Sequence, residues 1–431
     1  MKKLVVALLA ACAVSSAFAN GAKEQGSAGS SGPIELRMSW WGSDSRHEAT
    51  LKALDLYMQR NPHVKVVAEY QGFNGYHDKL ITQIYSGTEP DLYQLDNNVY
   101  FADLAMTDRL TDLKPFIDQG IINLDDYPKD ALDWATYNGT VYGVPSGLNG
   151  PVMYYNKAIF DKTGVAYPTD DWTWKDLEEA GKKIHAADPN LYGMKEPSYF
   201  LVEAMMRQKG GWIADPTGAI QDFSKEMGEV FAQLNEWRAN GVIPPLDVSA
   251  GRMSQNDNLF LSGKVAIEVN HVATFPMQSA AVVGQPPCAV AMIPESKTAG
   301  GVYMLASMPW TIGKGGKHKE EAAKLLNFLI NDPDAGKILM TQRGVPGPTH
   351  IREAITPLLS DVEKQVINGV NGLVECTKRI DYEFLMPGSA VIENVINEES
   401  SNTGYGLKTP QQAGMDCYKR IKDAVEAAKK K

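Results

Sequence analysis

The chain has 431 residues, of which 44% are hydrophobic, and its formal net charge at pH 7 is −10. That length is enough for two or three domains, each with a core of its own. An acidic surface disfavours a phosphate-backbone partner, so we expect no nucleic acid ligand.

The amino-terminal residues have the layout of a secretory signal peptide. Lys2 and Lys3 precede an apolar run over residues 4–14, and a small-residue pattern, Ala-Phe-Ala, follows at 17–19. A membrane-spanning helix needs roughly 20 apolar residues, so this run is too short to be a permanent span. The pattern predicts cleavage after residue 19 and export from the cytoplasm.

A second processing signal overlaps the first. Residues 9–12 read Leu-Ala-Ala-Cys and resemble a lipobox, which would make Cys12 the lipidated first residue of the mature protein. We therefore expect a signal peptide over 1–19, or over 1–11 with a lipidated Cys12. Either route places the protein in the periplasm or anchored to the outer face of the cytoplasmic membrane. Residues 20–33 are rich in Gly, Ser and Ala, which predicts a flexible tether.

Strand and helix patterns alternate from Ile34 onward. Apolar residues at every second position predict strands over 34–40 and 64–70, and a further strand is predicted over 92–95. Helical spacing of apolar residues fills the two intervals between these strands. This order is typical of a parallel sheet with right-handed crossovers, so the predicted fold class is α/β.

The rest of the chain is richer in helical patterns. A strand over 303–312 and a helix over 319–330 repeat the early alternation. Between the two regions, Thr173 is placed to cap a helix, and 223–240 has helical spacing. A last helix is predicted over 410–430. No internal repeat of 20–50 residues is present.

The cysteines carry no recognisable metal or redox motif. Cys288, Cys376 and Cys417 remain in the mature chain, and none belongs to a Cys-x-x-Cys pair. Two readings stay open, in which all three are buried small hydrophobes or Cys376 and Cys417 form one disulfide. The sequence predicts no metal and no cofactor.

Ligands of an open parallel sheet bind at the carboxyl ends of its strands, where loops converge. Here those ends are residues 40–43, 70–73 and 96–98, which combine tryptophan, tyrosine and phenylalanine with carboxylate and amide groups. Aromatic rings stack on the C–H faces of sugars, while amides and carboxylates bind the hydroxyl groups. Trp40 has the parity of the buried face and can serve either the core or a ligand, whereas Trp41 has the opposite parity, which favours ligand contact.

Several blocks in the same order resemble extracellular solute-binding proteins of the maltose-binding type, which serve ATP-binding-cassette (ABC) sugar importers. They are Trp-Trp-Gly-Ser-Asp-Ser-Arg-His at 40–47, Gly-Thr-Glu-Pro-Asp-Leu at 87–92, Asn-Gly-Thr-Val-Tyr-Gly-Val-Pro at 138–145, Trp-Thr-Trp-Lys-Asp-Leu at 172–177 and Gly-Lys-Val-Ala-Ile at 263–267. The similarity covers nearly all of the mature chain. One departure is Ala273 and Phe275, where many family members carry a tryptophan.

The resemblance implies two α/β lobes joined by crossing segments, with the ligand held in a cleft that closes about the hinge. It places lobe 1 at 34–146 plus 308–345 and lobe 2 at 147–307 plus 346–431. The candidate ligand-binding residues are aromatic, amide, hydroxyl or charged side chains at strand ends and crossings: Trp40, Trp41, Ser43, Arg46, Phe73, Asp96, Asn97, Asn149, Tyr199, Trp212, His271 and Trp310.

The start of the first block resembles the subset that binds pectin-derived oligosaccharides. In that reading Arg46 and His47 pair with a uronate carboxylate, because a guanidinium matches a carboxylate through two hydrogen bonds. Arg46 can equally be a solvated residue at a helix start or a partner of Asp44.

The predicted function is capture of a carbohydrate outside the cytoplasm and its delivery, by a monomer, to the membrane permease subunits of an ABC importer. An alternative is a sensory role, in which the closed form is presented to a chemoreceptor or sensor kinase. A glycoside-active enzyme is the remote alternative, since no sequence feature selects a pair of carboxylates for catalysis. The motifs Gly-x-Ser-x-Gly and His-Glu-x-x-His are absent.

Overall fold

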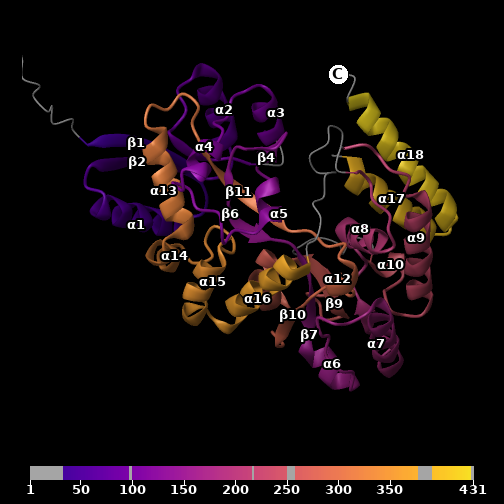
Figure 1. Cartoon of the computed structure of the whole chain (residues 1–431). Helices are drawn as coiled ribbons and strands as arrows, with labels where there is room; N and C mark the ends of the chain where they lie inside the picture. Colours follow the sequence, from indigo (N-terminus) through magenta and orange to yellow (C-terminus); the bar gives the residue numbers. More distant parts are fainter. Residues whose placement is uncertain (1–32, 97–99, 216–217, 250–257, 377–390, 429–431) are drawn as a thin grey trace, which may run out of the picture.

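The computed structural model describes residues 33–96, 100–215, 218–249, 258–376 and 391–428. These residues form two lobes side by side, each with a central sheet flanked by helices (Figure 1). The predicted two-lobed α/β fold is confirmed. Within the described residues, no helix combines the length and apolar character needed to cross a membrane.

The first sheet has five strands in the order β2-β1-β3-β11-β6. Their bounds are β1 Ile34–Trp41, β2 Val64–Gln71, β3 Leu92–Gln94, β6 Val144–Asn149 and β11 Leu305–Ile312. β1 pairs in parallel with β2 and β3, as the alternating pattern predicts. β11 pairs antiparallel with both β3 and β6, because it enters this sheet from the second lobe.

The second sheet has the order β10-β7-β9-β8. Its bounds are β7 Pro151–Asn156, β8 Tyr192–Met194, β9 Val265–His271 and β10 Cys288–Ala291. Only β8 and β9 pair in parallel, and β7 runs antiparallel to both β9 and β10. A short hairpin of β4 (Thr136–Tyr137) and β5 (Thr140–Val141) lies beside the first sheet.

Helices cover the sheets in two sets (Figure 1). Around the first sheet lie α1 Asp44–Arg60, α2 Tyr76–Ser86, α3 Phe101–Met106, α4 Lys114–Asp118, α5 Lys129–Asp133, α13 Lys319–Asn331, α14 Pro333–Leu339 and α15 Thr349–Ile355, followed by the 3-10 turn η2 Thr356–Leu358. Around the second lie α6 Lys157–Thr163, α7 Trp174–Ala187, α8 Tyr199–Gln208, α9 Ser224–Ala239, α10 Leu246–Ser249, η1 Val272–Thr274, α11 Phe275–Ala281, α12 Ser296–Ala299, α16 Asp361–Cys376, α17 Ile392–Gly404 and α18 Pro410–Ala428.

The predicted helices are present with small shifts at their ends. Thr173 caps α7, and its hydroxyl and backbone N–H exchange hydrogen bonds with Asp176 in a capping box. The helix predicted at the end of the chain is α18, which buries Ala413, Cys417, Ile421 and Val425. The described cysteines are free thiols, so the alternative of a Cys376–Cys417 disulfide is wrong and the buried-hydrophobe reading holds for these two residues.

The chain crosses between the two sheets three times. β6 ends at Asn149 and β7 begins at Pro151, so the first crossing is at Gly150. The second crossing leads from α12 into β11, and the third leads from η2 into α16. The lobe boundary predicted at 146/147 falls inside β6, and the division of the chain into lobes otherwise stays a prediction.

A return segment, residues 342–347, connects α14 to α15 and packs closely against the first sheet. Arg46 on α1 donates from Nε to the carbonyl oxygen of Gln342 at 2.7 Å. Leu148 of β6 forms an isolated bridge with Val345. A Cβ atom at Gly147 would lie 2.1 Å from the carbonyl oxygen of Arg343, so only glycine fits there.

We expect Gly147→Ala to destabilise the fold by about 3 kcal/mol, because the added methyl must push the return segment away from β6. Urea denaturation measures the change. Gly72→Ala is the matched control, since no heavy atom outside its chain neighbours lies within 4 Å of its Cβ position. Equal stabilities for the two variants would show that the contact at Gly147 relaxes freely.

Candidate carbohydrate site

Three strand ends of the first lobe bring predicted residues together. β1, β2 and β3 are parallel, so their carboxyl ends lie at one edge of the sheet, and Trp41, Phe73 and Asp96 follow from them. Trp41 is buried, with its ring 5.9 Å from that of Phe73. Phe73 itself is 55% exposed. The three residues predicted from the strand ends therefore lie at one edge of the sheet, where buried Trp41 packs against exposed Phe73.

A hollow of about 280 Å³ opens at this edge. We call it the first-lobe hollow. Its lining combines one exposed aromatic ring, two carboxylates and a histidine, contributed by Phe73, Asn74, Gly75, His77, Asp78, Asp96 and Tyr100. The described lining contains no lysine or arginine, so it offers hydrogen-bond acceptors next to an apolar ring.

His77 is fixed in one orientation inside this hollow. The backbone N–H of Asp96 donates to His77 Nε2 at 3.2 Å, and the imidazole stacks on the ring of Tyr100 with 5.2 Å between centroids. Burial lowers the pKa of His77, while Asp96 and Asp78 act in the opposite direction. The imidazole is therefore neutral at pH 7, with its proton on Nδ1.

Ser43 and Arg46 lie at the start of α1 and serve local structure. The Ser43 and Ser45 hydroxyls are 3.0 Å apart, and Ser45 donates to the side chain of Gln342. Besides its bond to the Gln342 carbonyl, Arg46 Nη1 lies 3.4 Å from the carbonyl oxygen of Trp41. Arg46 is thus neither a freely solvated residue nor a partner of Asp44, because it holds the return segment against β1.

Trp40 and Trp310 lie in the core of the first lobe. Their exposed fractions are 0% and 1%, and alternation along β1 turns Trp40 and Trp41 to opposite faces of the sheet. A direct ligand contact is not possible for either buried ring in this structure. Asn97 lies outside the described residues.

The second lobe gathers another set of predicted residues at the carboxyl ends of β8 and β9. Tyr199 begins α8 soon after β8, and His271 ends β9. Phe200 joins them, since its ring stacks on His271 with 5.1 Å between centroids and lies 5.6 Å from Tyr199. His271 Nε2 is 3.4 Å from the hydroxyl of Tyr303.

Trp212 joins this group through an arginine that the sequence reading did not select. Arg207 lies over the rings of both Trp212 and Tyr303, with 5.7 Å from its Cζ to each centroid. It also forms a buried ion pair of 3.0 Å with Glu203, one helical turn earlier on α8. Arg207 therefore holds the rings of Trp212 and Tyr303 in place through cation–π contacts.

Asn149 marks the first crossing. Its side-chain oxygen accepts a hydrogen bond of 3.0 Å from the backbone N–H of Ala273, just after β9. This bond links the end of a first-sheet strand to η1 of the second lobe. Asn149 therefore has a structural partner at the hinge.

The residues missed from the sequence are His77 and Tyr100 in the first lobe, and Arg207 and Tyr303 in the second. The sequence could have indicated Arg207, because Glu203 and Arg207 lie four residues apart in a mostly apolar helix, a spacing that allows an ion pair. His77 carried a weaker signal as a polar side chain that the helix buries. Tyr303 gave no such signal, because it was predicted as the first residue of a strand that in the structure begins at Leu305.

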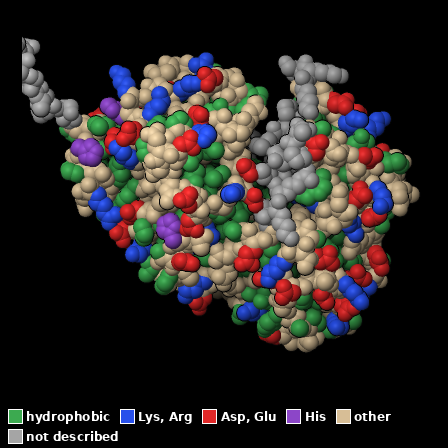
Figure 2. Space-filling view, viewed as in Figure 1, with side chains coloured by type: hydrophobic (Ala, Val, Ile, Leu, Met, Phe, Trp, Pro, Cys, Tyr) green, Lys and Arg blue, Asp and Glu red, His purple; other side chains and the backbone are tan. Residues whose placement is uncertain are grey.

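The structure is that of a two-lobed α/β protein, and acidic and basic side chains are mixed over the face of both lobes that Figure 2 shows. The family model described as bacterial extracellular solute-binding protein matches residues 43–335, and the chain belongs to this family.

Among similar proteins, the arabinooligosaccharide-binding protein of Halalkalibacterium halodurans is 27% identical over 173 residues, which are 40% of this chain and 38% of that protein. The alignment thus spans well under half of that relative's length. A periplasmic oligogalacturonide-binding protein from Yersinia enterocolitica is 26% identical in sequence, with a TM-score of 0.78, over 92% of this chain and all of the other. A de novo designed cysteine esterase has a TM-score of 0.80 and 26% identity, over 93% of this chain and all of the other.

We expect protonation of His271 to weaken the fold in mild acid. Burial lowers its pKa to about 4, whereas an unfolded histidine titrates near 6.5. The unfolded chain therefore binds the proton first, and the stability contributed by the neutral ring is complete above pH 6.5 and is lost as the pH falls toward 4. The loss at this one residue between pH 7 and pH 5 is about 2 kcal/mol.

Urea denaturation of the wild type and of His271→Phe at pH 7 and pH 5 measures this loss of unfolding free energy. The variant keeps a ring beside Phe200 but has no group that titrates. The variant should lose about 2 kcal/mol less than the wild type. His63→Gln, at an exposed histidine, should behave as the wild type does. An equal loss in wild type and His271→Phe would contradict the assignment.

Proposed function

We propose that this protein captures an oligosaccharide between its two lobes and delivers it to the permease subunits of an ABC importer. The observation that carries the proposal is the first-lobe hollow, in which exposed Phe73 stands beside the carboxylates of Asp78 and Asp96. An aromatic ring next to acceptors suits a sugar, whose C–H face stacks while its hydroxyls donate.

The aromatic group of the second lobe supports the same proposal. Tyr199 begins α8, Trp212 follows the same helix and His271 ends β9, so one lobe positions all three side chains. Closure of the lobes would enclose a ligand between this group and the first-lobe hollow, and would exclude water from its hydrogen bonds. The names of similar proteins agree with a saccharide ligand, since they include binders of arabino-oligosaccharides and oligogalacturonides.

Two solved structures of the Yersinia protein differ in their similarity to this chain. The TM-score of this chain is 0.78 against one of them and 0.67 against the complex with saturated digalacturonic acid. The chain as a whole is therefore less similar to the digalacturonate complex. A rotation of the lobes on ligand binding would account for that difference.

The class of oligosaccharide that the hollow binds, neutral or uronate-containing, depends on the charges that line it. The described lining of the hollow carries Asp78 and Asp96, whose negative charges disfavour a carboxylate, and Arg46 is engaged with the return segment. We therefore place a neutral sugar ring in the hollow. A uronate would have to bind elsewhere in the cleft.

An enzymatic role, as in the designed cysteine esterase, is disfavoured by the state of the described thiols. Burial raises the pKa of all three, to about 11 for Cys288, so none is a thiolate at neutral pH. The sensory alternative uses the same capture step and differs only in the membrane partner.

Phe73→Ala should weaken oligosaccharide binding about tenfold, because it removes the exposed ring on which the sugar stacks. Isothermal titration calorimetry with arabino-oligosaccharides and malto-oligosaccharides measures the affinity. Tyr405→Ala is the matched control, since Tyr405 is 56% exposed on the turn after α17 and should leave the affinity unchanged. Undiminished binding by Phe73→Ala would remove the hollow from the site.

The ligand class can be read from thermal shifts of the mature protein with neutral and uronic oligosaccharides. A ligand at 100 times its Kd stabilises the folded state by about 2.7 kcal/mol. We expect neutral oligosaccharides to give the larger shift, and Arg46→Gln to lower the melting temperature without abolishing that shift. A shift with uronic oligosaccharides alone, lost in Arg46→Gln, would instead support the pectin-type reading.

A further inference from the structure

A row of three side chains crosses the buried face of the first sheet. β11 pairs Trp310 with Gln94 on β3, and the register of β1 with β3 places Trp40 on the other side of Gln94. Directly opposed residues point to the same face of a sheet, so the amide lies between the two indole rings. Gln94 and Trp40 are completely buried, and Trp310 is 1% exposed.

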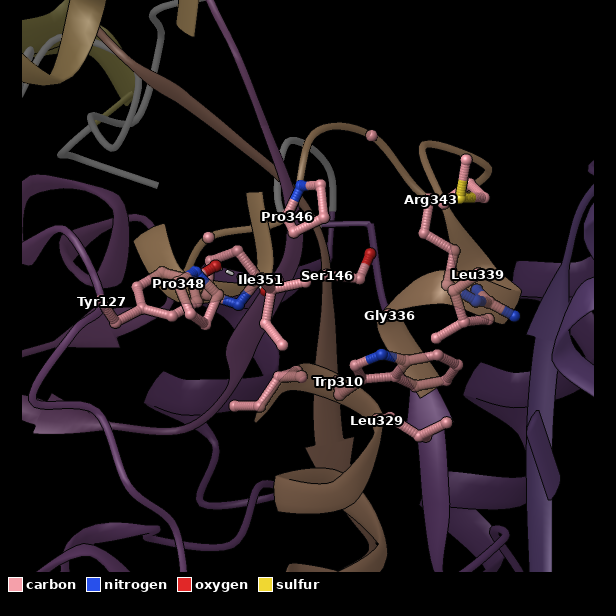
Figure 3. Close-up of a pocket in the computed structure, with 15 residues that line it drawn as sticks. Tyr127, Ser146, Trp310, Leu329, Gly336, Leu339, Arg343, Pro346, Pro348 and Ile351 are labelled. Carbon is pink, nitrogen blue, oxygen red and sulfur yellow. Dashed lines mark hydrogen bonds between the residues drawn. The ribbon is translucent and has the colours of Figure 1, made fainter. Parts of the chain in front are cut away.

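Arg343 of the return segment covers this row. Its Cζ lies 4.5 Å from the ring of Trp310 and 5.6 Å from the ring of Trp40, so the guanidinium is above the position of Gln94. Nη2 donates to the hydroxyl of Thr50 at 2.6 Å. Figure 3 shows Arg343 beside Leu339 and Trp310, at the border of a cavity of about 30 Å³.

Four polar atoms at this place have no hydrogen-bond partner among the described residues. They are Nε and Nη1 of Arg343 and Nε2 and Oε1 of Gln94. A buried donor without a partner destabilises the folded state, and Arg343 is only 4% exposed. Two such residues next to each other indicate a shared partner for both.

The electrostatics of the place favour a negatively charged partner. Arg343 forms no ion pair with any carboxylate in the described part of the chain, and its charged neighbour Arg46 repels it. A guanidinium keeps its proton in proteins, so the charge must be balanced. A water molecule could accept the hydrogen bonds but would leave the charge of Arg343 uncompensated.

We propose that Arg343 and Gln94 form an internal site for a monatomic anion of the size of chloride, enclosed between Trp40 and Trp310. Three N–H groups converge on it, from Nε and Nη1 of Arg343 and from Nε2 of Gln94. The bound anion neutralises Arg343 and thereby holds the return segment on the first sheet. This site is separate from the first-lobe hollow, on the opposite face of the sheet.

Bromide is the probe. Crystals of the mature protein grown in sodium bromide, with data collected at the bromine absorption edge, should show an anomalous peak within hydrogen-bond reach of both Arg343 and Gln94. A water in that position without anomalous signal would overturn the proposal. So would a direct hydrogen bond from Arg343 to Gln94 Oε1.

Melting temperatures give a second readout in solution. At equal ionic strength, chloride or bromide should raise the melting temperature by about 2 °C over gluconate, an ion too large for the site. Gln94→Glu supplies a carboxylate in place of the anion, so it should fold, lose the halide dependence and show no bromide peak. Gln411→Glu, at an exposed glutamine of α18, adds the same charge elsewhere and should keep the halide dependence. Persistence of the halide effect in Gln94→Glu would refute the site.

Discussion

The contact between the return segment and the first sheet is the constraint on which the rest of the structure depends. Arg343 lies over Trp40 and Trp310, Arg46 holds the carbonyl of Gln342, and Gly147 admits the backbone of Arg343. These contacts join β1, β6 and β11 to one loop. They fix the edge of the sheet at which the first-lobe hollow opens, and they set the position from which α15 leads toward the third crossing.

Hydrogen bonds between polar groups connect the two lobes at the crossings, whereas packed aromatic rings stabilise the core of the first lobe. Asn149 bonds to the backbone of Ala273 at the first crossing, and Arg352 on α15 donates to Asn371 on α16 at the third. Hydrogen bonds of this kind can change partners at small cost, whereas packed rings cannot. Polar contacts of this kind would allow the lobe rotation that the proposed function requires.

Much of the fold could be predicted because it depends on local periodicity. The alternation of β1 and β2 and the capping of α7 by Thr173 are visible in short windows of sequence. The direction of β11 was not visible, because it depends on which lobe the preceding chain occupies. The resemblance to a known family supplied the two-lobed plan that periodicity alone leaves open.

The site was predicted less well, for a physical reason. Their position at strand ends was enough to select Phe73 and Asp96 as candidates. The alternation of β1 placed Trp40 and Trp41 on opposite faces of the sheet, but it could not show that both side chains are buried. The contact of Arg46 with Gln342 could not be predicted, because a guanidinium near a strand end can bind a ligand or a distant carbonyl, and Gln342 is almost 300 residues away in the chain. The contacts of His77 with Asp96 and Tyr100 form only in the folded chain. The same is true of the contacts of Arg207 with Trp212 and Tyr303.

The strand order of the first sheet also governs how the chain can fold. β3 ends at Gln94, and its neighbour β11 begins at Leu305, after all four strands of the second sheet have been synthesised. Until then β3 and β6 have no strand to join them, and the first lobe remains incomplete. Such long-range pairing makes folding slow relative to local structure. The first sheet therefore cannot be completed until the last third of the chain is present.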